Sequence, residues 1–287
     1  MAKISIIILT YNSSAYILNL IKSLISLRDE FEIIVVDNAS TDDTLKLVES
    51  SGLKVQKVIK LPKNIGFAGG INAGAKVSSG EYLLFLNPDT VFEHGTIKDL
   101  LKIYEKNEKV GIVGGKMIDE NGNPERSAGR FFNLFEVLIT VLGLDEVFGV
   151  RFSPKKFTKV DFVSGGFMMV KKDLFEKLRG FDEKFFMYVE DMEFCFRAKK
   201  IGINTYFTPN AVVSHKGQGS SNRGFAIIHI YKGLLYFYRK HKSNIQFKIV
   251  KFLLQSKALT IYMLGRMTNN SYYTQAYKNA LTGINNL

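Results

Sequence analysis

An aspartate, Asp89, follows a run of apolar residues that is typical of a buried strand. The run is Tyr82–Leu86, and Asn87-Pro88-Asp89 comes directly after it. Because proline cannot donate a ladder hydrogen bond, the strand should end here and deliver the carboxylate to its carboxyl end, where open α/β sheets bind ligands. An unpaired charge at a buried edge is costly, so we expect a cationic partner or a metal ion beside Asp89. The alternative is that Asp89 only caps the following segment.

A second aspartate, Asp37, ends the apolar run 32–37. There it can accept a hydrogen bond from an imide N–H of the kind that uracil and thymine present. Helix capping is the alternative, but Ser40, Thr41 and Asp43 can already cap the helix that follows. These redundant caps favour a ligand role for Asp37.

A glycine-rich turn, 66–74, opens a further predicted helix. Such a turn lets backbone N–H groups and the helix dipole approach a phosphate. The stretch matches neither the dinucleotide-binding fingerprint nor the P-loop. Glycines that serve only close packing of the helix on the sheet are the alternative.

Two adjacent acids, Glu190 and Asp191, open another predicted helix after the aromatic segment 185–189. A carboxylate in a partly apolar cleft can act as a general base toward a sugar hydroxyl. The alternative is a pair of acids that only complements the helix dipole. A helix N-terminus lowers the pKa of a carboxyl and burial raises it, so the sequence leaves the direction of the shift open.

A histidine, His215, ends a predicted strand and precedes a Gly/Ser-rich loop that carries Lys216 and Arg223. This combination suits a lid over a diphosphate, although a lone histidine is often structural. Arg126 and Arg130 are further candidate phosphate contacts, with solvated side chains as the alternative.

The elements that must position these residues alternate between strands and helices in the first half of the chain. Repeated units of this length predict a doubly wound, mainly parallel sheet. The predicted strands are 4–9, 32–37, 55–61 and 82–86, and the predicted helices are 14–27, a short one that ends near 52, and 66–79.

The second half is less regular. The segment 119–123 is typical of a hairpin turn, and 124–160 has no clean period and is interpreted as a substrate-facing insertion. Strands are predicted at 162–170, 203–207 and 211–214, a helix within 181–202, and two amphipathic helices within 225–267. We therefore expect the catalytic core to end near Gly224.

Composition and charge restrict the class of protein. The single cysteine, Cys195, excludes an intrachain disulfide framework, and no apolar run approaches the roughly 18 residues of a membrane-spanning helix. The N-terminus is typical of a strand rather than a signal peptide. The first 193 residues hold 25 basic and 27 acidic residues, whereas residues 194–287 hold 14 basic residues and no acidic ones. This tail predicts an anionic partner: a membrane surface, a lipid phosphate or nucleic acid.

Eight segments, taken together and in order, resemble glycosyltransferase family 2, the inverting enzymes with a GT-A fold, and especially its rhamnosyltransferase-like members. They cover about residues 3–241 and comprise Ile6–Asn12, Val35–Thr44, Asn64–Gly74, Asn87–Asp89, Gly165–Phe167, Gly180–Asp191, Val213–His215 and Tyr236–His241.

The resemblance implies an α/β fold of GT-A type. It would have a Rossmann-like, mainly parallel central sheet, a small acceptor-side subregion and C-terminal amphipathic helices. The catalytic domain would be 1–224, with a nucleotide-sugar-binding half at 1–120 and an acceptor-binding half at 121–224, and a basic helical region would follow at 225–287.

The resemblance also implies roles for the matched residues. Asp191 would deprotonate the acceptor hydroxyl and Glu190 would assist in acceptor binding, while Asp89 and His215 would bind Mg²⁺ or Mn²⁺. Asn87 stands where the fuller Asp-x-Asp motif has its first acid, so Asp89 is expected to be the main protein carboxylate on the cation. The nucleotide sugar would be bound by Thr10, Tyr11, Asn12, Asp37 (on the base), Asn64, Gly66, Phe67, Asn72, Asn87 and Asp89.

These roles predict a metal-assisted single displacement that inverts the anomeric carbon. The donor would be a nucleoside-diphosphate sugar, dTDP-rhamnose or a UDP-sugar, and the acceptor a saccharide or a lipid-linked saccharide. A retaining mechanism would need a second carboxylate at the anomeric carbon, for which the sequence offers no separate candidate. A sugar nucleotidyltransferase and a non-catalytic membrane-surface or carbohydrate-binding module are the alternative functions. No nucleic-acid-reading motif is present, so nucleic acid is not an expected partner.

The basic tail predicts a place for the protein in the cell. We expect a cytoplasmic protein, peripheral on the inner face of the cell membrane, whose tail lies on the anionic leaflet. An ordinary solvated helix face over a core is the alternative. The helix face toward the membrane would carry Lys248, Lys251 and Gln255 beside Phe247, Phe252 and Leu254.

Overall fold

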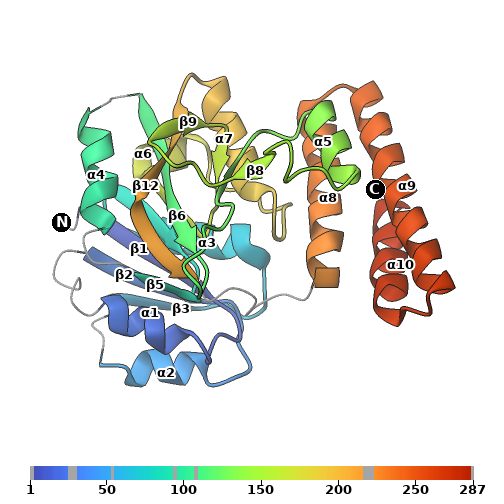
Figure 1. Ribbon diagram of the computed structural model, residues 1–287. Coiled ribbons are helices and arrows are strands. Elements are labelled where there is room, and N and C mark those ends of the chain that lie inside the picture. The colour runs from blue at the N-terminus through green and yellow to red at the C-terminus, as the bar shows by residue number, and fades with distance from the viewer. Residues whose placement is uncertain are drawn as a thin grey trace.

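A nine-stranded mixed sheet is the centre of the fold (Figure 1). The computed structural model describes residues 3–24, 31–52, 55–92, 96–106, 109–215 and 223–285. Parallel strands form the first half of the sheet, in the order β3 (Lys57–Lys60), β2 (Phe31–Asp37), β1 (Ile4–Thr10) and β4 (Tyr82–Leu86). Their carboxyl ends share one edge, as the sequence predicts.

The sheet changes direction at β11 (Phe167–Lys171), which pairs antiparallel with β4 and with β6 (Val110–Ile118). Beyond β6, β12 (Asn204–His215) runs parallel to it, and β5 (Thr90–Phe92) and β9 (Thr158–Val160) pair antiparallel with β12. The prediction of two separate strands at 203–207 and 211–214 is wrong. Both segments belong to β12, which continues through a shift of register between Thr208 and Val212.

Helices cover both faces of the sheet because its inner strands are apolar on both sides. In β1, Ile7 belongs to the buried cluster that includes α3 (Gly66–Val77), whereas Ile6 and Ile8 belong to the cluster that includes α1 (Ile17–Leu24). The predicted helix 14–27 begins only at Ile17 in the structure, and its residues 25–27 lie outside the described residues. The other helices of this part are α2 (Thr44–Ser50), α4 (Thr96–Lys106), α6 (Lys172–Lys177) and α7 (Glu190–Lys200).

A small second sheet, with the order β10-β7-β8, forms within the predicted insertion and at its end. Its strands are β10 (Phe162–Val163), β7 (Ala128–Gly129) and β8 (Arg151–Phe152), and α5 (Leu134–Val141) lies between β7 and β8 in the chain. The predicted strand 162–170 is wrong as one unit, because the chain turns at Ser164-Gly165-Gly166 and its two halves join different sheets. The predicted turn at 119–123 is confirmed by a bridge between Ile118 and Pro124.

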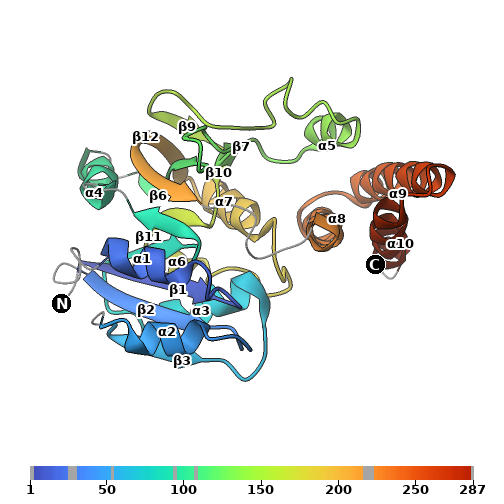
Figure 2. The ribbon, with the colours of Figure 1, turned by 60° about the horizontal axis from the view of Figure 1, so that its bottom comes forward.

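Three helices end the chain: α8 (Arg223–His241), α9 (Asn244–Met267) and α10 (Ser271–Asn285), the last of which the sequence patterns do not predict. In both views α8 lies between the part that bears the sheets and the pair α9–α10 (Figures 1 and 2). Buried residues of α8, such as Leu235 and Tyr238, belong to one cluster with residues of α3 and α7. None of the helices in the described part of the chain is long and apolar enough to cross a membrane.

A buried carboxylate, Glu32, fixes the edge of the sheet opposite to the strand carboxyl ends. It accepts hydrogen bonds from the Ser5 hydroxyl at 2.6 Å and from the Ser79 N–H at 2.7 Å, and it pairs with Lys57 at 3.2 Å. Burial raises the pKa of Glu32, but these hydrogen bonds outweigh burial and lower the pKa to about 2. The ionised form is therefore bound more tightly in the folded protein than in the unfolded chain.

We expect Glu32→Gln to lower the free energy of unfolding at pH 7 by about 2–3 kcal/mol, because a carboxyl with a depressed pKa stabilises the fold while it is ionised. The difference from wild type should shrink as the pH falls from about 4.5 to about 2 and the wild-type carboxyl takes up a proton. Urea unfolding across this range measures it. Glu49→Gln, which breaks only an exposed pair with Lys60, is the control. Equal unfolding midpoints for the two variants would contradict the prediction.

Candidate active site

A cavity of 570 Å³, here named the strand-end cavity, lies at the carboxyl ends of β1 and β4. Five predicted nucleotide-sugar residues are part of its lining: Tyr11, Asn64, Gly66, Phe67 and Asn87. The rest of the lining consists of Ser13 and Asn38 and of the apolar residues Leu9, Pro88, Phe186, Met187 and Phe225. A cavity with few polar groups among apolar walls is typical of a small-molecule site.

Thr10, Asn12 and Asp37 are held beside this cavity by local hydrogen bonds. Thr10 and Asp37 are buried register partners of β1 and β2. The Asp37 carboxylate accepts the Ser40 N–H at 3.2 Å, and Asn12 Oδ1 accepts the Thr41 N–H at 2.8 Å. Asp37 thus binds the turn before α2, which begins only at Thr44, and does not cap that helix; its contact with a base stays a prediction.

The glycine turn at the start of α3 is fixed by two asparagines. Asn38 donates to Asn64 Oδ1 at 2.9 Å, and Asn64 Oδ1 also accepts the Gly66 N–H at 2.9 Å. Gly66 has φ +81°, and a Cβ there would lie 2.1 Å from the carbonyl oxygen of Phe186. The same carbonyl accepts the Phe67 N–H at 2.7 Å. Glycine is required here because the turn packs directly on the backbone that leads to α7.

Asn72 lies apart from the strand-end cavity. Its amide donates to the Phe181 carbonyl and to Glu183, each at 2.9 Å, and its Oδ1 accepts the Phe181 N–H at 2.9 Å. This side chain therefore ties α3 to the segment before α7. Its assignment to the nucleotide sugar stays a prediction.

Asn87 is the point at which three cavities meet. It lines the strand-end cavity, a cavity of 340 Å³ that contains Glu190 and Asp191 (the Asp191 cavity) and a cavity of 450 Å³ that contains His215 (the His215 cavity). The turn Gly165-Gly166 makes this meeting possible. A Cβ at Gly166 would lie 2.6 Å from Asn87 Nδ2, and one at Gly165 would lie 3.0 Å from the ring of Phe67.

Two predicted carboxyls, Glu190 and Asp191, open α7 in the Asp191 cavity. Asp191 accepts the Gly165 N–H at 3.1 Å and its neighbour Met192 N–H at 2.7 Å. Glu190 is 5% exposed, and among the described residues its Oε2 has no hydrogen-bond partner. The two carboxyls therefore differ sharply in how well the protein solvates their charge.

Burial raises the pKa of both carboxyls, which answers the question that the sequence left open. For Asp191, burial outweighs the Gly165 hydrogen bond and the positive charge of Arg151. For Glu190, the charge of Asp191 adds to burial and holds the pKa well above its ordinary value. The raised pKa gives Asp191 increased proton affinity, as a general base requires, and its two N–H donors make Asp191 the carboxyl whose charge the geometry favours.

Asp89 and His215 come together as predicted, and Asp89 has a cationic partner rather than a cap. His215 Nε2 lies 3.3 Å from Asp89 Oδ2, and its Nδ1 lies 2.9 Å from Glu125 Oε2. Burial lowers the pKa of His215, but the hydrogen bonds and charges of Asp89 and Glu125 outweigh it and raise that pKa to about 10.

The same residues fit a divalent cation, which would displace the His215 proton because only the neutral imidazole binds a metal. Asp89 Oδ1 is buried and has no hydrogen-bond partner among the described residues. A histidine whose second ring nitrogen faces a carboxylate, as His215 faces Glu125, is typical of a metal ligand. Within the described ranges no three His, Cys, Asp or Glu side chains form a metal-binding group. A cation held by Asp89 and His215 would thus need further ligands from a substrate or from water.

The arginines divide between ion pairs and the cavities. Arg126 lines the His215 cavity but pairs with Asp145 and Glu146, whereas the Arg130 side chain is exposed. Arg151, which the sequence patterns do not single out, lines both the Asp191 and the His215 cavity. The predicted lid, 216–223, falls outside the side chains that the structure describes.

The family is decided by a sequence model. The model of glycosyl transferase family 2 matches residues 5–179, more than half of the chain. The chain belongs to glycosyltransferase family 2. The matched range holds Asp37 and Asp89 and ends before Asp191 and His215, so the second half of the site rests on the geometry given above.

Known family relatives agree with this membership. The low-salt glycan biosynthesis hexosyltransferase Agl10 of Haloferax volcanii is 28% identical over 217 residues, 70% of this chain and 63% of the relative. The N-acetylglucosaminyl-diphospho-decaprenol L-rhamnosyltransferase of Mycobacterium tuberculosis is 25% identical over 247 residues, 76% of this chain and 77% of the relative. The chain therefore spans less than two thirds of Agl10, and the resemblance to rhamnosyltransferases is confirmed.

A solved structure shows the same fold. The mannosyltransferase PcManGT of Pyrobaculum calidifontis, in complex with GDP-Man and Mn²⁺, superposes with a TM-score of 0.60 over 98% of this chain and 84% of the other, at 17% identity. The prediction of a GT-A type α/β fold is confirmed.

We expect Gly66→Ala to destabilise the protein more than Gly122→Ala by about 1–3 kcal/mol in urea unfolding. Both glycines have a left-handed φ, +81° and +80°, and pay the same conformational cost on substitution, but only Gly66 faces a backbone atom, the Phe186 carbonyl oxygen. Nothing lies within 4 Å of a Cβ at Gly122, so this variant is the matched control. Equal losses of unfolding free energy in the two variants would show that the close contact between α3 and the segment before α7 does not require glycine.

Proposed function

We propose that this protein is an inverting glycosyltransferase that transfers a sugar from a nucleoside-diphosphate sugar to a saccharide or lipid-linked saccharide. The observation that carries the proposal is the Asp191 carboxyl, held by the Gly165 N–H in a cavity that meets the strand-end cavity at Asn87. A donor in the strand-end cavity and an acceptor in the Asp191 cavity would then have their reacting atoms at this junction.

Asp191 is the proposed general base. It would remove the proton from the acceptor hydroxyl as the oxygen attacks the anomeric carbon, and the attack from the face opposite the leaving diphosphate inverts that carbon. The Gly165 N–H orients the carboxylate, and the protonated Glu190 avoids a second negative charge beside it and can donate a hydrogen bond to the acceptor. Mg²⁺ or Mn²⁺ held by Asp89 and His215 would offset negative charge on the diphosphate.

The proposed donor is dTDP-rhamnose, with a UDP-sugar as the alternative. The rhamnosyltransferase among the relatives supports the sugar. The apolar wall of Phe67, Phe186 and Phe225 suits a deoxy sugar, since a methyl group there loses no hydrogen bond to water. The acceptor named for that relative supports a lipid-linked saccharide.

Incubation with a panel of nucleotide sugars, with and without Mg²⁺ or Mn²⁺, tests the proposal. Transfer or hydrolysis of one donor supports it, and calorimetry that detects no donor binding would reject it. Formation of a nucleotide sugar from a nucleoside triphosphate and a sugar phosphate would instead support the nucleotidyltransferase. Binding to carbohydrate or membrane without any turnover would support the non-catalytic module.

We expect Asp191→Asn to lower kcat by roughly 10²–10⁴-fold, because an amide cannot accept the acceptor proton. Donor binding by calorimetry should stay at the wild-type level, since Asp191 lies in the cavity beyond Asn87. Asp99→Asn, which removes the same charge from α4, is the control and should keep full activity. Transfer near the wild-type rate in Asp191→Asn would exclude Asp191 as the base.

We propose further that the protein is cytoplasmic and peripheral on the inner face of the cell membrane, where α9 touches anionic lipid. Apolar side chains recur along the outer side of α9 at helical spacing and form the α9 outer stripe. The stripe consists of Ile245, Ile249, Phe252, Leu259, Met263 and Met267, which are 42–79% exposed. The helix face that the sequence predicts to lie on the membrane is partly wrong. Of its three apolar residues, Leu254 is buried and Phe247 packs on the core, and only Phe252 points outward.

Charge favours lipid over a second copy as the occupant of this stripe. The stripe lies in the segment 194–287, which has no acidic residue, and Lys248 and Lys251 flank it. Two copies packed through the stripe would bring these cations together and repel each other. Binding to an anionic leaflet is instead strengthened by roughly 1 kcal/mol for each basic residue near the surface.

Ile249→Ser/Phe252→Ser should weaken flotation with phosphatidylglycerol vesicles by about tenfold or more, because two exposed apolar side chains no longer enter the lipid. Ile201→Ser, an exposed apolar residue outside the C-terminal helices, is the control. Unchanged binding of the double variant, or equal binding of wild type to neutral vesicles, would contradict the proposal. A wild-type dimer that the double variant dissociates would assign the stripe to a second copy.

A further inference from the structure

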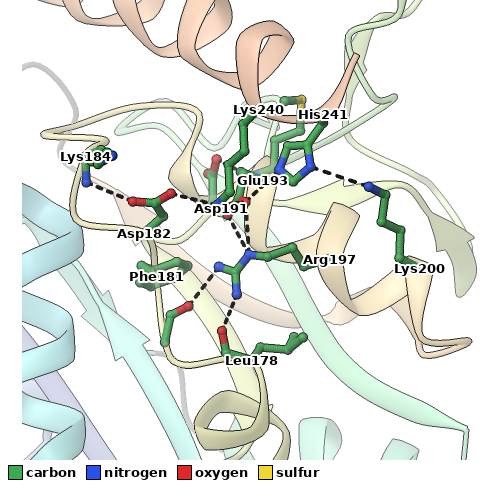
Figure 3. Close-up of polar contacts among 12 residues, drawn as sticks. Leu178, Phe181, Asp182, Lys184, Asp191, Glu193, Arg197, Lys200, Lys240 and His241 are labelled. Atoms are coloured by element: carbon green, nitrogen blue, oxygen red, sulfur yellow. Dashed lines mark hydrogen bonds and ion pairs between the residues drawn. The ribbon is translucent and has the colours of Figure 1, made fainter. Parts of the chain in front are cut away.

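The third acid of α7, Glu193, has no part in the proposed chemistry and is fully buried, at 0% exposure. It stands two positions after Asp191, and residues of an α-helix turn by about 100° each, so it points to the opposite side of α7. Asp191 lines the Asp191 cavity, whereas Glu193 contacts His241 at the end of α8 (Figure 3). A contact made by Glu193 therefore fixes α7 on the helix face opposite to the proposed base.

The partners of Glu193 come from two helices (Figure 3). Arg197, one turn later in α7, donates to both carboxylate oxygens at 3.0 and 2.8 Å. From α8, Lys240 lies 2.8 Å and His241 2.9 Å from Glu193 Oε1. Burial raises the pKa of Glu193, but these partners outweigh it and lower the pKa, so the carboxylate stays charged in the interior. We name Glu193, Lys240 and His241 the α7–α8 lock.

The lock extends to the segment before α7. Lys240 also pairs with Asp182 at 2.6 Å, and the Tyr236 hydroxyl donates to the same carboxylate at 2.9 Å. Arg197 donates to the carbonyls of Leu178 and Gly180. The beginning of the segment that enters α7 is thus tied to Lys240 of α8 and to Arg197, which both pair with Glu193.

A separate contact places α8 against a strained turn. Tyr188 and Val189, which directly precede Glu190, have φ values of 67° and 73°, in the left-handed region that a β-branched residue rarely adopts. Gly233 of α8 packs on them so closely that a Cβ there would lie 3.0 Å from Val189 Cγ2 and 3.1 Å from the Tyr188 carbonyl oxygen. Strained backbone persists only where its surroundings hold it, and α8 supplies such surroundings.

We propose that α8 completes the active site: Glu193 and Lys240 are positioning residues that set the place of Asp191. This inference rests on the proposed role of Asp191 as the base. It gives the C-terminal helices a task in catalysis that does not depend on a membrane. If α7 shifts, Asp191 loses its 3.1 Å hydrogen bond to Gly165 and its alignment with the acceptor hydroxyl.

Lys240→Met tests the proposal with a soluble acceptor. It removes the ties from Lys240 to Glu193 and Asp182, while Arg197 still pairs with Glu193 and His241 still contacts it, so the variant should fold. We expect kcat to fall roughly tenfold or more, since a small misplacement of a catalytic group is enough, with the KM for the donor within about twofold. Lys240→Arg should recover most of the loss. Lys278→Met, an exposed lysine of α10, is the matched control.

The pH profile separates positioning from a general loss of stability. Without the Gly165 hydrogen bond the pKa of Asp191 rises, so the acid limb of kcat should move to higher pH in Lys240→Met. The other charged or titratable groups around Asp191 are unchanged in this variant, namely Glu190, Arg151 and Cys195, together with Asp145 and Tyr188 of the same cavity. Glu193→Gln should show the same shift and a larger loss of kcat.

Hydrogen exchange provides a readout that needs no activity. The amides of 188–194 should exchange faster in Lys240→Met than in wild type or Lys278→Met. If Lys240→Met has the kcat, the acid limb and the exchange rates of the wild type, the proposed role of the lock is overturned. A wild-type protein that transfers no sugar, with faster exchange in the variant, would reject the proposed function and leave the lock standing.

Discussion

The fold depends on one contact for the integrity of its site: the start of α3 packs on the segment that leads into α7. Phe67 donates to the Phe186 carbonyl, Gly66 leaves room for that carbonyl, and Asn72 binds the backbone of Phe181 in both directions. One side of this contact forms a wall of the strand-end cavity, and the other side leads directly to Glu190 and Asp191. Two parts of the chain more than a hundred residues apart are thereby fixed at hydrogen-bond distance, which is the precision that group transfer between two bound molecules requires.

Charge segregation along the sequence has a structural counterpart. Glu193 is the last acidic residue of the chain, and everything after it that is charged is basic. Lys240 and His241 belong to that basic tail and contact Glu193. Together with the pair between Lys240 and Asp182, these contacts place charged groups at the boundary between the core and the C-terminal helices. A buried pair of this kind contributes little to stability compared with apolar packing, but a mispaired arrangement leaves a charge without a partner and is strongly disfavoured. The pattern therefore selects one docking of α8.

The sequence predicts the strand ends well because apolar runs and their terminators are local. Asp37, Asp89 and His215 all stand at the ends of β-strands, and Asp191 stands in the first turn of a helix, as expected. The tertiary partners could not be predicted. Glu125 beside His215, the Gly165 N–H on Asp191 and Asn38 on the glycine turn are defined by contacts across the fold, and only the last two occur within segments that resemble the family. The break at Ser164-Gly165-Gly166 interrupts an apolar run whose two halves look alike in sequence, so only their pairing in different sheets separates them.

The cavities share more than a junction, because Phe67 and Met187 line both the strand-end cavity and the Asp191 cavity. A ligand that reorients either side chain changes the wall that the second ligand meets, and by thermodynamic reciprocity the two affinities change by the same factor. Under the proposed function, the selectivities for donor and acceptor are then not separable in evolution. A mutation at Phe67 that adapts one cavity to a new ligand also alters the other, so a change of one specificity in this lineage requires compensation in the other.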